Sequence, residues 1–222
     1  MATDSHALTT TEHSPVAGLA HDSRGGISNV ILGMLLFITS EVMFFAGLFA
    51  AYFSVRANAQ VWPPINPEST AIPQEAFHLA ILPLVGPATV LLILSSFTCQ
   101  FAVWGIRSGD RTAFIRNIGV TFVIGITFLI MQAIDYAVLG REGLTMSSGV
   151  FGTTYFTLTG FHGAHVFAGV VMLGVVLYRG MAGQFSARHH DAVESVSLYW
   201  HFVDVVWILL FSLLYLLPGK TA

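Results

Sequence analysis

The chain has 222 residues, of which 55% are hydrophobic and only 9% are charged, and its formal net charge is −3. This charge excludes the basic surface typical of nucleic-acid-binding proteins. The single cysteine, Cys99, excludes an intramolecular disulfide, and the lack of a CxxCH sequence excludes covalent haem attachment. The composition instead indicates an integral membrane protein.

Residues 1–29 are polar and contain His6, His13 and His21 among serines and threonines. They lack the apolar stretch and small-residue cleavage site of a signal peptide. We predict a flexible N-terminal tail, since so polar a segment has no core to fold around.

Five long apolar segments follow the tail. Each exceeds the roughly 20 residues that a helix needs to cross the hydrocarbon core of a bilayer. The sequence therefore predicts an all-α, polytopic transmembrane helical bundle at 30–217, with a short C-terminal tail at 218–222. The predicted spans are 30–55, 80–106, 114–139, 152–179 and 193–217.

The distribution of basic residues predicts the orientation of the five spans. The N-terminal tail and the second and fourth connections share one side and hold six of the nine basic residues: Arg24, Arg107, Arg111, Arg116, Arg179 and Arg188. The opposite side holds Arg56, Arg141 and Lys220. By the positive-inside rule the N-terminus is cytoplasmic and the C-terminus lies outside, which for a bacterium means the inner membrane.

Glu41 lies about eleven residues into the first span, close to the bilayer centre by helical rise. Its helical neighbours are Phe37, Ile38, Phe44 and Phe45, and no Lys or Arg occurs at this depth. We predict a protonated carboxyl, because desolvation disfavours the charged form. It serves either a function or a structural hydrogen bond within the bundle.

The third and fourth spans add three polar candidates. Asp135 lies close to the outer end of the third span. His162 and His165 share one face near the middle of the fourth. Two histidines three residues apart are weak evidence for a metal site, which would need ligands from elsewhere, and a hydrogen-bonded structural pair is the simpler interpretation.

The fifth span carries a polar stripe that starts at its cytoplasmic end and stops near its middle, made of Glu194, Ser197, His201 and Asp204. His201 and Asp204 can pair directly at this spacing. The stripe either conducts protons or is the face that docks another helix. From their similar depths, Glu41, His162 and Asp204 are predicted to face one another.

Three segments together resemble subunit III of haem–copper terminal oxidases, in the right order and spacing. They are residues 40–47 (SEVMFFAG), 157–166 (TLTGFHGAHV) and 199–207 (YWHFVDVVW). The likeness covers residues 30–217 and is to the five-helix form, which lacks the first two helices of the seven-helix version. The family usually has Glu where this chain has Asp135, which leaves the role of that carboxylate open.

The resemblance implies a subunit without a redox centre, catalytic residue or bound metal. Haem and copper belong to subunits I and II, and subunit I is the main partner. The implied roles are assembly, phospholipid binding, proton uptake and sustained turnover. The proton- or oxygen-path candidates are Glu41, His162, His165, His201, Asp204 and Asp135.

Alternatives remain at this point. Residues 149–156 (GVFGTTYF) look more like a cytochrome c oxidase than a quinol oxidase, but the electron donor, cytochrome c or quinol, is chosen by other subunits. Membership of a respiratory supercomplex is open as well. A b-type haem protein would use His162 and His201 as axial ligands, and a proton-coupled transporter would use Glu41, His201 and Asp204.

Overall fold

The computed structural model describes residues 28–62 and 84–217. The predicted tails, apart from residues 28 and 29, lie outside the described residues, as do residues 80–83 of the predicted second span. Among the described residues there are five long helices, each apolar and long enough to cross a membrane, which confirms the predicted all-helical membrane fold.

The five helices are joined by short connections wherever the structure describes the chain between them. They are α1 (Asn29–Asn58), α2 (Gly86–Arg107), α3 (Arg111–Arg141), α4 (Val150–Met181) and α5 (Asp191–Phe211), and α5 continues into a π-helical turn, η2 (Ser212–Leu216). Pro87 falls in the first turn of α2, where its missing N–H has no helical partner to lose.

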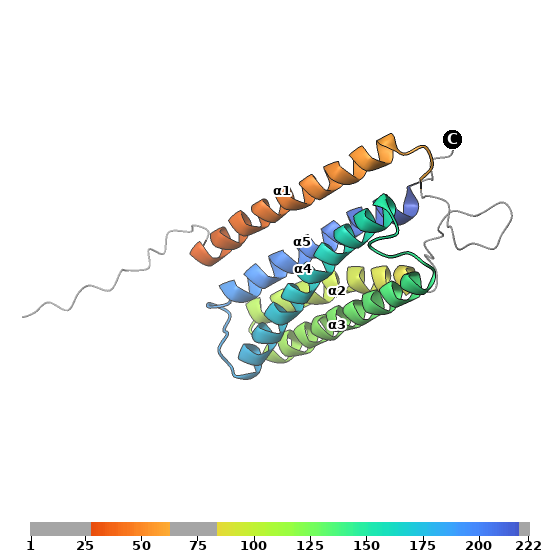
Figure 1. The fold of residues 1–222 in the computed structure, drawn as a ribbon. Coiled ribbons are helices and arrows are strands. Elements are labelled where there is room, and N and C mark those ends of the chain that lie inside the picture. The colour runs from red at the N-terminus through yellow and green to blue at the C-terminus, as the bar shows by residue number, and fades with distance from the viewer. Residues whose placement is uncertain (1–27, 63–83, 218–222) are drawn as a thin grey trace, which may run out of the picture.

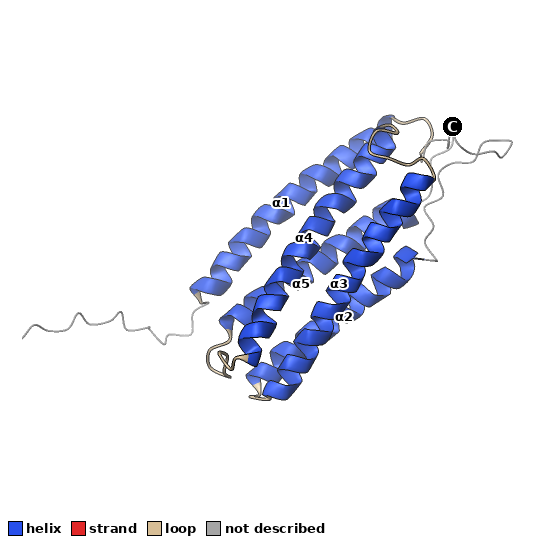
Figure 2. Ribbon diagram, turned by 60° about the horizontal axis from the view of Figure 1, so that its bottom comes forward, coloured by secondary structure: helices blue, strands red, loops and turns tan. Residues whose placement is uncertain are grey.

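The helices lie side by side in one bundle (Figure 1, Figure 2). We call the end that holds the start of α1 and the α2–α3 and α4–α5 connections the N-terminal face, and the other end the C-terminal face. The α2–α3 connection is a tight turn in which Gly109 takes a positive φ of 80° and Asp110 caps α3, its Oδ1 accepting from the Ala113 N–H at 2.9 Å.

Helix α5 lies at the centre of the bundle and packs against α1, α2 and α4, and α3 packs against α2 and α4. Two α5 indoles, Trp200 and Trp207, are almost wholly buried. Each donates its Nε1–H to a hydroxyl of α2, Trp200 to Ser95 at 2.9 Å and Trp207 to Thr89 at 3.0 Å. These bonds satisfy the indole N–H groups in the dry interior and fix the rotation of α5 against α2.

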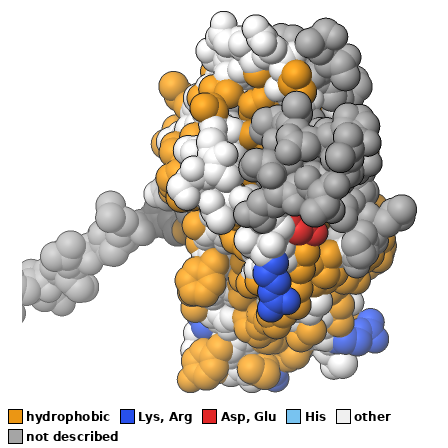
Figure 3. Space-filling model, turned by 45° about the vertical axis from the view of Figure 1, so that its right-hand side comes forward, with side chains coloured by type: hydrophobic (Ala, Val, Ile, Leu, Met, Phe, Trp, Pro, Cys, Tyr) orange, Lys and Arg blue, Asp and Glu red, His pale blue; other side chains and the backbone are white. Residues whose placement is uncertain are grey.

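Helix α1 lies at the edge of the bundle, mainly against α5 (Figure 1). Only Phe45 and Tyr52 of its residues are buried. Tyr52 ties the C-terminal half of α1 to the end of α5, because its hydroxyl donates to the carbonyl of Leu213 at 2.8 Å. The rest of α1 exposes large apolar side chains, and hydrophobic side chains are also frequent on the surface in Figure 3. Such a surface suits contact with lipid acyl chains or with other membrane helices.

Candidate functional site

The polar side chains predicted as candidates form separate clusters inside the bundle. Glu41 is bonded to His165, Asp204 is bonded to Ser96, and His162 lies among aromatic rings. The prediction that Glu41, His162 and Asp204 face one another is therefore wrong. Their depths are similar, but the rotation of each helix, which depth does not determine, directs them to different neighbours.

Glu41 and His165 join α1 to α4. Oε2 of Glu41 lies 2.8 Å from Nε2 of His165, and Nδ1 of His165 lies 2.7 Å from the carbonyl oxygen of Phe161. A carbonyl oxygen can only accept, so Nδ1 carries a hydrogen. The contact with Glu41 then needs one more proton, held either by the carboxyl as a neutral acid or by Nε2 as an imidazolium. The pair is thus a site for one proton.

The surroundings of this pair are aromatic, as the sequence predicts. The ring centroids of Phe44 and Phe45 lie 6.2 and 4.9 Å from that of His165. The two polar side chains are 20% and 15% exposed, so the pair is partly open at the edge of the bundle. A basic partner for Glu41 does exist at its depth, since a histidine takes the place of the absent Lys or Arg.

His162 is fully buried and stands apart from its neighbour His165. Its ring stacks on Trp207 with centroids 4.9 Å apart and meets the edge of Phe128 at 5.9 Å. Neither ring nitrogen has a hydrogen-bond partner among the residues that the structure describes. The expected hydrogen-bonded pair of His162 and His165 is not found, because the two rings have different neighbours.

Asp204 is linked to His201 through a serine of the neighbouring helix. Ser96 on α2 donates its hydroxyl to Oδ2 of Asp204, and Nδ1 of His201 lies 3.2 Å from the same hydroxyl oxygen. Direct pairing of His201 with Asp204, which their spacing suggested, is therefore replaced by a bridge. Asp204 is 3% exposed, and its Oδ1 has no partner in the described part of the chain.

The remaining polar stripe of α5 also faces α2, so it does dock another helix. The thiol of Cys99 donates to Ser197 Oγ at 3.5 Å. At the N-terminal face, Oε1 of Glu194 accepts from Arg107 Nε at 2.8 Å and lies 2.9 Å from His190 Nε2. Between these contacts the packing leaves a pocket of about 140 Å³, lined by Ile31, Gln100, Val103, Arg107, Glu194, Ser197, Leu198 and His201.

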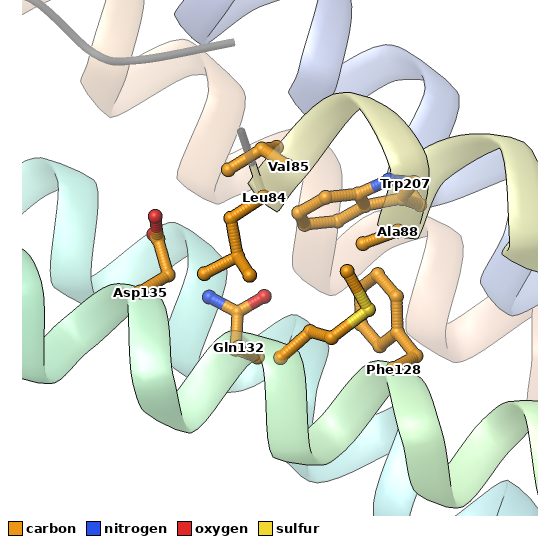
Figure 4. A pocket seen from close by; sticks show the side chains of 8 residues that line it. Leu84, Val85, Ala88, Phe128, Gln132, Asp135 and Trp207 are labelled. Carbon is orange, nitrogen blue, oxygen red and sulfur yellow. The ribbon is translucent and has the colours of Figure 1, made fainter. Parts of the chain in front are cut away.

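Asp135 belongs to a third cluster near the C-terminal face. The Tyr155 hydroxyl donates to Oδ2 of Asp135 at 3.0 Å and lies 2.7 Å from the hydroxyl of Tyr215. Asp135 and Gln132 also line a small cavity with Leu84, at the other end of which lie Phe128 and Trp207 (Figure 4). The cluster joins α3, α4 and the π-helical end of α5.

The described residues contain no group of three or more His, Cys, Asp or Glu side chains that could hold a metal ion. The acids Glu41, Asp135 and Asp204 are instead each bonded to a hydroxyl or an imidazole. Such pairs bind and exchange protons, and they also fix the helices against one another.

Sequence reasoning missed Ser96, Tyr155 and Tyr215, the hydroxyl partners of the buried acids. Hydroxyl groups are common in apolar helices, where they bond the carbonyl one turn back, as Thr127 does to Val123. No sequence signal separates such a hydroxyl from one that reaches another helix.

Comparison with known proteins gives a consistent result. Residues 20–218 match the family model described as Cytochrome c oxidase subunit III. The chain is 42% identical over 186 residues to the "Cytochrome c oxidase subunit 3" of Corynebacterium diphtheriae, which covers 84% of this chain and 87% of the relative. It is 40% identical over 187 residues to the "Probable cytochrome c oxidase subunit 3" of Mycobacterium tuberculosis H37Rv, with the same coverage.

A more distant relative is longer. The "Cytochrome c oxidase subunit 3" of Cyprinus carpio is 37% identical over 188 residues, which is 82% of this chain but 67% of the carp protein.

Proposed function

The chain belongs to the cytochrome c oxidase subunit III family and is a multi-pass membrane subunit of an oxidase complex, and we propose that it supports proton uptake and sustained turnover by the subunits that carry out the chemistry. The family has no catalytic centre of its own. The work of this chain is therefore done through its packing and its buried polar groups.

The contact between Glu41 and His165 carries this proposal. It holds one exchangeable proton at mid-membrane depth. Both side chains are partly exposed, at the edge of the bundle where α1 buries few of its residues. A proton-binding pair inside a membrane is costly to bury for packing alone. Its position suits a group that exchanges protons with a partner subunit or with its hydration water, and in this family such a group is also associated with oxygen access.

The proposal assigns partners by the same argument. Subunit I, which holds haem and copper, is the main contact, and subunit II completes the core. The apolar flanks of α1 are covered by subunit I and by phospholipid acyl chains, which hold the subunit in the assembly. The excess of arginine at the N-terminal face supports a cytoplasmic location for that face, with the C-terminus outside.

Cytochrome c is the proposed electron donor, reached through the complex. The names of the matching family and of its relatives support it over quinol. Membership of this family explains the buried histidines and acids in place of the two alternatives, a b-type haem protein and a proton-coupled transporter.

The test is a comparison of the purified oxidase with and without this subunit. We expect the depleted complex to reduce oxygen at first, to take up protons more slowly, and to lose activity after fewer turnovers. Glu41→Gln in the complete complex is expected to reproduce part of this loss. Ser40→Ala is the matched control, because Ser40 is one residue away and its hydroxyl bonds only its own helix. A depleted complex with full turnover and full durability would refute the proposal.

A further inference from the structure

A second polar system, separate from Glu41 and His165, runs along the contact of α2 with α5. It starts at the pocket at the N-terminal face, where Arg107, Glu194 and Gln100 line the wall, and it reaches His201. From His201 it passes through the hydroxyl of Ser96 to the carboxyl of Asp204. By helical rise from Asp191, Asp204 lies about 20 Å into the bundle.

The hydrogen bonds that link His201, Ser96 and Asp204 have a defined direction. Ser96 donates its only hydroxyl hydrogen to Oδ2 of Asp204, so its oxygen must accept from His201, and Nδ1 of His201 carries the hydrogen. The second ring nitrogen, Nε2, then has no hydrogen while the ring is neutral. His201 lines the pocket and no described residue is bonded to its Nε2, so this nitrogen is the acceptor that the chain offers to incoming water.

This arrangement can load one proton with all atoms accounted for. A proton binds Nε2 of His201, the Nδ1 proton moves to Ser96, and the former Ser96 hydroxyl proton moves to Asp204. His201 ends as the other neutral tautomer, Ser96 is again a hydroxyl, and Asp204 has become a neutral carboxylic acid. The reverse sequence releases the proton to the pocket.

The series of hydrogen bonds from the pocket ends at Asp204. Beyond it, towards the C-terminal face, the Nε1–H of Trp207 is bonded to Thr89, and the hydroxyl of Thr89 donates to the carbonyl of Val85. No described hydrogen bond leads from Asp204 to these groups, and its second oxygen, Oδ1, is buried without a partner. Asp204 therefore takes its proton on Oδ2, the oxygen that faces Ser96, and no described hydrogen bond leads onward from its buried second oxygen.

We propose that Asp204 is a proton-storage site, loaded and emptied only from the N-terminal face through the pocket, His201 and Ser96. Its use in respiration rests on the proposed role of the subunit in proton uptake: a blind side branch of this kind buffers protons near the partner subunit without allowing them to leak across the membrane. The site itself is argued only from the hydrogen bonds and the pocket.

Other titratable groups face this system and must be separated from it. The thiol of Cys99 on α2 lies beside the chain, bonded to Ser197. Glu194 faces the pocket with its partners Arg107 and His190. Helix α1 contributes the apolar Ile31 to the pocket wall. Infrared spectroscopy separates a protonated carboxyl from the thiol, guanidinium and imidazole groups, because the carboxyl has its own carbonyl band, and Asp204→Asn separates Asp204 from Glu194.

The experiment uses the complete oxidase complex and follows the carboxyl band and its shift on transfer to D₂O. Asp204→Asn is expected to remove a band that Glu41→Gln leaves in place. Ser96→Ala keeps Asp204 but interrupts the relay, so we expect the deuterium shift of that band to slow by about tenfold or more. Ser40→Ala, which removes a hydroxyl of α1 outside the chain, is expected to leave the shift rate unchanged.

Two results would overturn the inference: an unchanged band in Asp204→Asn, or a wild-type exchange rate in an assembled Ser96→Ala complex. If Asp204→Asn does not assemble, Ser96→Ala alone decides, since its band and its exchange rate are both measured. The proposed function can fail separately. In that case the band and its dependence on Ser96 remain, while removal of the subunit leaves turnover and durability intact.

Discussion

The indole ring of Trp200 occupies the space in front of Gly125. A Cβ atom added to Gly125 would lie 2.7 Å from Cη2 of Trp200, and one added to Gly169 would lie 2.9 Å from Cε3 of the same ring. The central tryptophan of α5 is thus held between glycines of α3 and α4, while its N–H bonds Ser95 of α2. One side chain fixes α5 against three helices, and with it the directions of Tyr199 and His201.

Gly125→Ala and Gly169→Ala are expected to destabilise the subunit. Each adds a methyl group where the rigid indole leaves no room, and such overpacking costs about 1–3 kcal/mol. The measurement is the thermal unfolding of the purified complex, monitored through the release of this subunit. Gly163→Ala is the matched control, because it lies on α4 and nothing is within 4 Å of the added atom. Equal effects at all three positions would contradict the prediction.

Glu41→Gln and His165→Gln are expected to be non-additive. Either change alone leaves a partly buried polar partner with a poorer bond, while the double variant removes both partners of the contact together. We expect a coupling free energy of about 1 kcal/mol, typical of hydrogen bonds inside membranes. The thermal stability of the four complexes in this cycle measures it. Additive losses would show that the 2.8 Å contact contributes nothing to stability.

Tyr155→Phe is expected to weaken the junction of α3, α4 and the end of α5. The change removes one hydroxyl that bonds both Asp135 and Tyr215, and it leaves the partly buried Asp135 carboxyl unpaired at that oxygen. The expected loss of stability is about 1–3 kcal/mol. Tyr178→Phe on the same helix is the control, because its side chain is exposed at 68%. Similar melting temperatures for the two variants would show that the cluster is not a structural tie.

The sequence predicts the membrane helices because their signal is local. Crossing a bilayer requires about 20 apolar residues. Gly109, which takes a positive φ, and Asp110, which caps the next helix, mark a turn without help from the rest of the fold. The same is true of the candidate residues as a set, since a carboxyl such as Glu41 is conspicuous in an apolar segment. Their partners are another matter.

Partner choice depends on helix rotation and on which helices are neighbours, and neither is local. Glu41 and His165 are 124 residues apart in the chain, and Ser96 and Asp204 are 108 apart. The rotation of α5 is set by the fit of Trp200 between Gly125 and Gly169. In the sequence these glycines look like any small residues of a membrane helix. The depth of a residue can therefore be predicted, whereas its contacts had to come from the structure.

His162 and His165 provide the sharpest contrast, because they lie three residues apart on one helix. Substituting His162 by Leu removes two ring nitrogens that have no partner in the described residues. Removing unsatisfied buried polar atoms is favourable or neutral. Losing the stack on Trp207 costs about 0.5–1.5 kcal/mol, so the two effects nearly cancel. We expect the stability of the complex to change by no more than about 1 kcal/mol, with unchanged turnover.

The same substitution at His165 should have a clear effect. His165→Leu leaves the partly buried Glu41 carboxyl without its imidazole partner, and an unpaired group of this kind costs about 1–3 kcal/mol. Unfolding and oxygen consumption of the two variants, measured side by side, test the difference. If His162→Leu reduced turnover in a complex that still assembled normally, His162 would have a role in proton transfer that its surroundings do not indicate.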